Sequence, residues 1–161
     1  NERFSMVKFI KNFFSSKKED PIYDDDLDLN LAIIVILLRA SSIDGIKDDI
    51  ELNMIKDIAE RELNIEKEVL ESLYTKAIEE ENFSADIYKY TKIINDNYEE
   101  KDKLNVLKLV CKIINVDKKI DPFESNFVRR LSGLLYITDR QAGEIKKEFL
   151  DSWHTLLMKN A

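Results

Sequence analysis

Two short acidic segments of this chain share the spacing D-x-x-x-D-x-x-E. The acids of the two copies are Asp44, Asp48 and Glu51 in the first, and Asp117, Asp121 and Glu124 in the second. Hard divalent cations bind several oxygens, typically carboxylates on a loop together with one acid on the helix that follows. Because these segments offer only oxygen ligands, they predict weak binding of Ca²⁺, Mg²⁺ or Mn²⁺ in preference to zinc.

The same acids also have a purely structural interpretation. Asp48 with Glu51 has the spacing of a capping box, in which two side chains three residues apart satisfy backbone donors of the first helical turn. Asp121 with Glu124 has the same spacing, and acids at helix N-termini are favoured by the helix dipole. Capping is the simpler interpretation, but it leaves Asp44 and Asp117 without a role. Both interpretations therefore stay open.

The two acidic segments belong to a longer internal repeat. They are 73 residues apart, from Asp44 to Asp117, and apolar positions on both sides share that offset. The pairs are Leu31 with Leu104, Ile34 with Leu107, Leu38 with Cys111, and Ile58 with Leu131. Shared flanking helices make an internal duplication the best explanation. The duplication predicts that the central helices, Leu31–Ser41 and Leu104–Asn115, pack against each other.

Composition favours helices throughout. Charged residues make up 35% of the chain and apolar residues 44%, with only 3 Gly and 2 Pro as helix breakers. We predict an all-α fold: a single helical-bundle domain of about seven helices in two pseudosymmetric halves, plus an N-terminal amphipathic helix. The expected helices are Asp28–Ser41, three that begin after caps at Asp48, Asn64 and Ser84, one at Glu100–Asn115, and two that begin after caps at Asp121 and Thr138, the last paired with Gln141.

The first residues of the chain differ from the rest in charge. Residues 1–18 carry five bases and one acid, whereas residues 19–28 carry six acids and no base. On a helix, Phe9, Ile10, Phe13 and Phe14 share one face, with Lys8 and Lys11 on or near the other. Such a helix predicts weak, peripheral contact with an anionic membrane. The expected organisation is a basic helix and start of a linker at 1–20, an acidic linker at 21–28, and a helical domain at 29–161 with halves at about 29–80 and 100–150.

Several functions are disfavoured by the composition. A net charge of −7 argues against binding of nucleic acid. One cysteine forms no internal disulfide, which fits a reducing, cytoplasmic compartment. His154 and Cys111 suggest a solvated histidine and a small buried side chain, not a catalytic pair, and the Glu79–Glu81 run suggests a solvated helix end. We therefore expect a protein that is not an enzyme and that acts through a protein partner.

These motifs resemble the TerB-like (tellurite-resistance) superfamily. The resemblance covers roughly residues 29–149 and depends on an apolar helix ending in R-A-S-S-I-D-G, on Y-T-K-I-I-N, and on D-P-F-E followed by V-R-R-L and L-L-Y-I. Members are all-helical, have two pseudosymmetric halves, and are not recognised as enzymes. Their acidic loops have been proposed to bind divalent metal, and a related module forms the N-terminal part of a membrane-anchored J-domain co-chaperone. In this chain Ile46 and Lys119 stand near places where the family usually has acids, and Lys118 stands where a glycine is usual.

The resemblance implies a non-enzymatic TerB-like adaptor or stress-response protein, with a divalent cation bound through the duplicated acidic loops. The alternative is a peripheral membrane-associated helper, or a co-chaperone-like interaction module, attached at the inner face of the membrane through the N-terminal helix.

Overall fold

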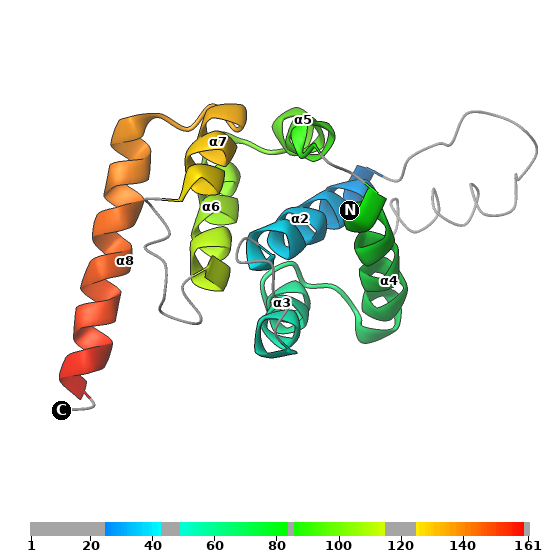
Figure 1. The fold of residues 1–161 in the computed structure, drawn as a ribbon, viewed down its shortest axis with the longest axis horizontal. Helices are drawn as coiled ribbons and strands as arrows, with labels where there is room; N and C mark the ends of the chain where they lie inside the picture. The colour runs from blue at the N-terminus through cyan, green and yellow to red at the C-terminus, as the bar shows by residue number, and fades with distance from the viewer. Residues whose placement is uncertain (1–24, 43–48, 84–85, 115–124, 160–161) are drawn as a thin grey trace, which may run out of the picture.

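The computed structural model describes residues 25–42, 49–83, 86–114 and 125–159 (Figure 1). Within these ranges all regular structure is α-helical, which confirms the predicted all-α bundle. The helices are α2 (Asp25–Ser41), α3 (Asp49–Arg61), α4 (Lys67–Phe83), α5 (Tyr88–Asn97), α6 (Glu100–Ile114), α7 (Asn126–Leu134) and α8 (Asp139–Lys159). The predicted N-terminal helix, with Phe9, Ile10, Phe13, Phe14, Lys8 and Lys11, lies outside the described residues.

Helix α2 is the centre of the bundle. Its residues from Leu31 to Leu38 are all buried, and Ile34 and Leu38 are fully so. A helix that is apolar on every side must be covered by several neighbours. Helices α3, α4, α5 and α6 all contact α2, and Figure 1 shows it in the middle of them.

Helix α6 is the second central helix. Leu107, Val110 and Cys111 are fully buried on it, and it contacts α2, α3, α7 and α8. The contact between α2 and α6, visible in Figure 1, confirms the prediction that the two equivalent apolar helices pack against each other. The core is therefore shared by both halves of the repeat.

The ends of the helices repeat with the predicted offset. Ser41 and Ile114, the last residues of α2 and α6, are 73 residues apart, and the same offset separates the last residues of α3 and α7. Each of these last two helices is followed by a non-glycine residue with positive φ, Asn64 (φ 55°) and Tyr136 (φ 57°). A left-handed residue just past the end reverses the chain and lets the next N–H groups satisfy the last carbonyls.

The residues after these reversals match as well. Ile65 and Ile137 are both buried, and each donates its backbone N–H to the helix just ended. In the second turn Ile137 N bonds to the Ser132 carbonyl at 2.9 Å, and Tyr136 N bonds to the Gly133 carbonyl at 3.2 Å. This is the Schellman arrangement, in which a buried side chain after the left-handed residue anchors the turn to the core. The two turns support a duplication of whole helical units.

Helix α5 connects the halves. It follows α4 in the chain and contacts both α2 and α7. Asn95 Nδ2 donates to the Leu134 carbonyl at 2.8 Å, and so satisfies a carbonyl in the last turn of α7. Arg130 of α7 also pairs with Asp86 at 2.8 Å, just before α5 begins.

Some predicted helix starts were wrong. Asn64 does not cap α4, because its left-handed backbone is unlike the extended conformation of an N-cap and α4 begins only at Lys67. Helix α7 begins at Asn126 and has Ser125 as N-cap, its hydroxyl accepting from Phe127 N at 3.2 Å, whereas the predicted cap Asp121 lies outside the described residues. Asp28 is not a cap either, because α2 already includes Asp25.

The capping box predicted for the last helix is confirmed. Gln141 N donates to the Thr138 hydroxyl at 3.2 Å, and Thr138 N donates to the Gln141 side-chain oxygen at 3.0 Å. The same glutamine side chain also hydrogen-bonds to Glu100 at the start of α6. The cap therefore stabilises the first turn of α8 and ties it to the second central helix.

Candidate functional site

Of the predicted cation ligands, the structure describes Glu51. The others lie outside the described residues: Asp44, Asp48, Asp117, Asp121 and Glu124. No cluster of three or more His, Cys, Asp or Glu side chains with metal-binding geometry occurs in the described ranges. The convergence of these six acids therefore stays a prediction. The candidate site is defined by the described side chains that precede and follow the two segments in the chain.

Glu51 is the third residue of α3 and is only 4% exposed. A buried carboxylate in a first helical turn is favoured by the helix dipole and by the N–H groups that have no partner within the helix. Because α3 begins at Asp49, Asp48 directly precedes the first helical residue. This placement suits a capping box, and it equally suits the last ligand of a cation loop.

A cavity of about 550 Å³ lies along α3 and reaches Lys112 of α6. Its walls include Ile50 and Met54 from α3 and Lys112 from the last turn of α6. Ile50 comes two residues after Asp48, and Lys112 comes five residues before Asp117. One cavity is thus lined by the helix that follows the first acidic segment and by the helix that precedes the second.

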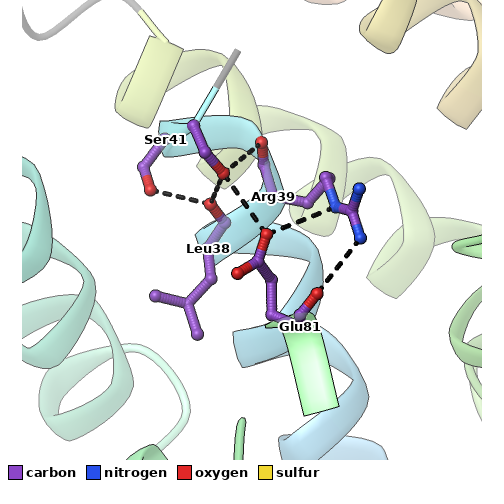
Figure 2. A network of polar contacts seen from close by, with 5 residues as sticks. Leu38, Arg39, Ser41 and Glu81 are labelled. Atoms are coloured by element: carbon purple, nitrogen blue, oxygen red, sulfur yellow. Dashed lines mark hydrogen bonds and ion pairs between the residues drawn. The ribbon is translucent and has the colours of Figure 1, made fainter. Parts of the chain in front are cut away.

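A polar network lies at the end of α2, directly before the first acidic segment (Figure 2). Arg39 Nε is 3.6 Å from Glu81 Oε1, and Arg39 Nη2 donates to the Glu81 carbonyl at 3.4 Å. The Ser42 hydroxyl donates to Glu81 Oε1 at 3.5 Å and to the Leu38 carbonyl at 2.8 Å. Ser41 donates to that same carbonyl at 2.7 Å.

The network joins the C-terminal ends of two helices. Arg39 is in the last turn of α2, where a cation is favoured by the helix dipole, and it also binds a carbonyl in the last turn of α4. Glu81 alone would be unfavourable at a C-terminal end with its side chain 9% exposed, so the arginine compensates its charge. The pair fixes the point at which the chain leaves α2 toward Asp44.

The interpretation of Glu79–Glu81 as a solvated helix end was wrong for Glu81, which is 8% exposed. Glu81 follows the buried residues Leu73 and Ala77 at four-residue spacing, so it lies on the face of α4 that packs against α2. That spacing is readable in the sequence and was overlooked. Glu80 is half-buried and accepts a hydrogen bond from the Tyr90 hydroxyl at 2.9 Å.

The side chains considered for chemistry have simple structural positions. Cys111 is fully buried in the core, as the sequence predicted, and His154 is exposed on α8. Of the three tyrosines in and around α5, Tyr88 is exposed, Tyr90 is buried and Tyr98 is half-buried.

The fold defines an all-α bundle with a duplicated central helix, and comparison with protein families gives its family. The model of the family described as tellurite resistance protein TerB matches residues 30–147. The chain belongs to the TerB family. No curated protein and no solved structure gives a match. Among the helices of the described ranges, none is both long enough and apolar enough to cross a bilayer.

Proposed function

We propose that this TerB-family chain is a non-enzymatic adaptor of a stress response, and that its acidic segments bind one divalent cation between the two halves. The observation that carries the proposal is the α3–α6 cavity, which is lined by the helix after the first acidic segment and by Lys112 of the helix before the second. Neither segment alone has the acids of a complete loop site. A shared site would combine Asp44, Asp48 and Glu51 with Asp117, Asp121 and Glu124.

The described charges around the cavity predict a weak site. Lys112 and Arg61 line the cavity together with Asp57 and Glu62, and Arg61 pairs with Asp57 at 3.6 Å, so the charges of the lining balance and add no net attraction for a cation. Glu51 is already buried, so part of the desolvation of this ligand is complete before the cation binds. We expect dissociation constants on the order of high micromolar to millimolar, in the range of weak calcium modules.

Calorimetric titration of the metal-free protein with Ca²⁺, Mg²⁺, Mn²⁺ and Zn²⁺ tests the shared site. A single shared cation predicts that Asp44→Asn and Asp117→Asn each abolish the heat of binding. Asp102→Asn, an exposed acid in the first turn of α6, is the matched control and should leave binding unchanged. Two independent sites would instead lose about half of the stoichiometry in each variant. If no heat appears at about 5 mM cation, at or above the expected dissociation constants, the acids serve only as caps.

A second candidate is peripheral attachment to the inner face of the membrane by the N-terminal segment. The observation behind it is the sequence pattern of Phe9, Ile10, Phe13 and Phe14 beside Lys8 and Lys11. Co-sedimentation with anionic liposomes, with and without residues 1–18, tests it. Loss of sedimentation on deletion supports attachment through this segment, and equal sedimentation of both proteins refutes it.

A further inference from the structure

A groove of about 740 Å³ lies between α4 and α5 and reaches α2. Its apolar surface includes Leu31 of α2 and Ile93 of α5, and its charged residues lie on both α4 and α5. Tyr88 also lines it, with 58% of its surface exposed. We call this feature the α4–α5 groove. It is distinct from the α3–α6 cavity, whose lining residues it does not share.

Both acids that line the groove accept hydrogen bonds. Glu80 accepts the Tyr90 hydroxyl at 2.9 Å, and Asp96 accepts from Lys92 Nζ at 2.9 Å. The hydrogen bond to Asp96 raises the pKa of the Lys92 ammonium above its ordinary value, in agreement with that pairing. Asp96 is therefore neutralised by Lys92, whereas Glu80 keeps its charge and is the one unpaired acid among the described residues that line the groove.

Two of its lysines remain available. Lys76 projects from α4 and Lys89 from α5, and within the described part of the chain neither forms an ion pair. Lys89 Nζ lies 5.6 Å from the centre of the Tyr90 ring, a cation–π contact that leaves its N–H donors for a ligand. In a chain with a net charge of −7, this is a local excess of positive charge above an apolar surface.

We propose that the α4–α5 groove docks an acidic peptide segment of a partner protein. Carboxylates of the segment pair with Lys76 and Lys89, and an apolar or aromatic side chain packs on Leu31 and Ile93 beside the Tyr88 ring. Charge complementarity selects and orients the segment, whereas the buried apolar contact supplies most of the affinity. This inference gives the partner chemistry of the adaptor role proposed above, and it does not depend on the cation.

Fluorescence anisotropy with the full chain tests the docking. The probe is a fluorescein-labelled peptide Glu-Asp-Phe-Glu-Asp-Leu-Glu-Asp, and the control peptide replaces each acid with its amide. We expect the acidic peptide to bind at least about tenfold more tightly than the amide peptide, equivalent to about 1.4 kcal/mol. We also expect the difference to shrink between about 50 mM and about 500 mM NaCl, because salt screens exposed charges.

Matched variants locate the binding. Lys76→Glu combined with Lys89→Glu should weaken acidic-peptide binding at least about tenfold, because two attractions become repulsions. Tyr88→Ala should weaken both peptides, since it removes apolar surface. Lys147→Glu on α8 reverses one charge, half the change in the double variant, at an exposed site away from the groove and should leave the affinity within about twofold. Circular dichroism of each variant confirms that the bundle is intact.

Three results would overturn the proposal. The first is equal affinity for the acidic and amide peptides. The second is an equal loss in Lys147→Glu, which would reduce the effect to overall charge. The third concerns the acidic stretch of this chain at residues 19–28, which is an internal competitor for Lys76 and Lys89. The substitutions Glu19→Gln, Asp20→Asn and Asp24→Asn in the full chain remove that competitor. If the acidic peptide binds only in that variant, the groove belongs to this internal segment and not to a partner. Because the titration contains no divalent cation, its failure leaves the cation experiment independent.

Discussion

Tyr74 offers a sharp test of the core because its removal should stabilise the protein. It is in the middle of α4, is 7% exposed, and its hydroxyl oxygen is buried. No hydrogen-bond partner for that hydroxyl occurs in the described residues. The ring itself makes a cation–π contact, because Lys56 Nζ lies 4.7 Å from its centre. The substitution Tyr74→Phe keeps the ring and deletes only the unsatisfied group.

The magnitude follows from the free energy of desolvating a hydroxyl. A buried polar group without a hydrogen bond costs about 1–3 kcal/mol, and phenylalanine avoids this cost while the shape is almost unchanged. The small void left by one oxygen offsets part of the gain. We therefore expect Tyr74→Phe to raise the free energy of unfolding by about 1 kcal/mol at neutral pH, which corresponds to about 2–4 °C in Tm for a chain of this size.

The pH dependence gives a second signature of the same hydroxyl. Burial, with a smaller contribution from the charge of Glu71, raises the pKa of Tyr74 above its ordinary value of 10.0. The unfolded chain then loses this proton at lower pH than the folded chain. The stability of the unsubstituted protein should consequently be constant with respect to this group below pH 10.0 and fall above it. The advantage of Tyr74→Phe should widen over that alkaline range.

Urea unfolding followed by circular dichroism measures both effects, at neutral pH and above pH 10.0. Tyr88→Phe, which removes a hydroxyl from a tyrosine that is 58% exposed, is the control and should change stability by less than about 0.5 kcal/mol. A loss of more than about 1 kcal/mol in Tyr74→Phe at neutral pH would refute the reasoning, because it would mean that the hydroxyl makes a stabilising hydrogen bond.

The other predictions concern the core, a turn and the N-terminal segment. Ile34→Ala and Leu107→Ala should each cost about 2–5 kcal/mol in urea unfolding, because both residues are fully buried in the shared core, whereas the exposed Glu68→Ala should cost under about 0.5 kcal/mol. Asn64→Ala should cost about 1 kcal/mol and Asn64→Gly nothing measurable, because only the alanine is strained at φ 55°; equal losses would point to a side-chain role. Deletion of residues 1–20 should leave Tm nearly unchanged, and a fall of more than about 10 °C, or over 2 kcal/mol, would contradict an independent segment.

The sequence by itself determined the helical class, the family and the duplication. Those features depend on residue type and spacing along the chain. An unbroken apolar run from Leu31 to Leu38 must be a covered helix, and its counterpart 73 residues later must be another. The Thr138–Gln141 cap was also predictable, because both partners lie within one helical turn.

N-cap residues in the sequence predicted the wrong helix starts where packing against a neighbouring helix determined the boundary. Asparagine is a favoured N-cap residue, but Asn64 instead forms the chain reversal after α3, and the buried Ile65 anchors that turn to the core. Asp121 and Ser125 both suit an N-cap chemically, and the structure places the start of α7 at the serine. Several polar residues near a boundary can each end or begin a helix, and packing of the apolar positions selects one of them.

Only the tertiary structure decided which charges are buried together. Arg39 and Glu81 are 42 residues apart, and their pairing depends on the meeting of the ends of α2 and α4, which no local pattern states. The same holds for Lys76 and Lys89, which line one groove only because α4 and α5 both pack against α2. Spacing along a helix fixes which residues share a face, but the free energy of burying that face against a particular neighbour is a property of the assembled bundle.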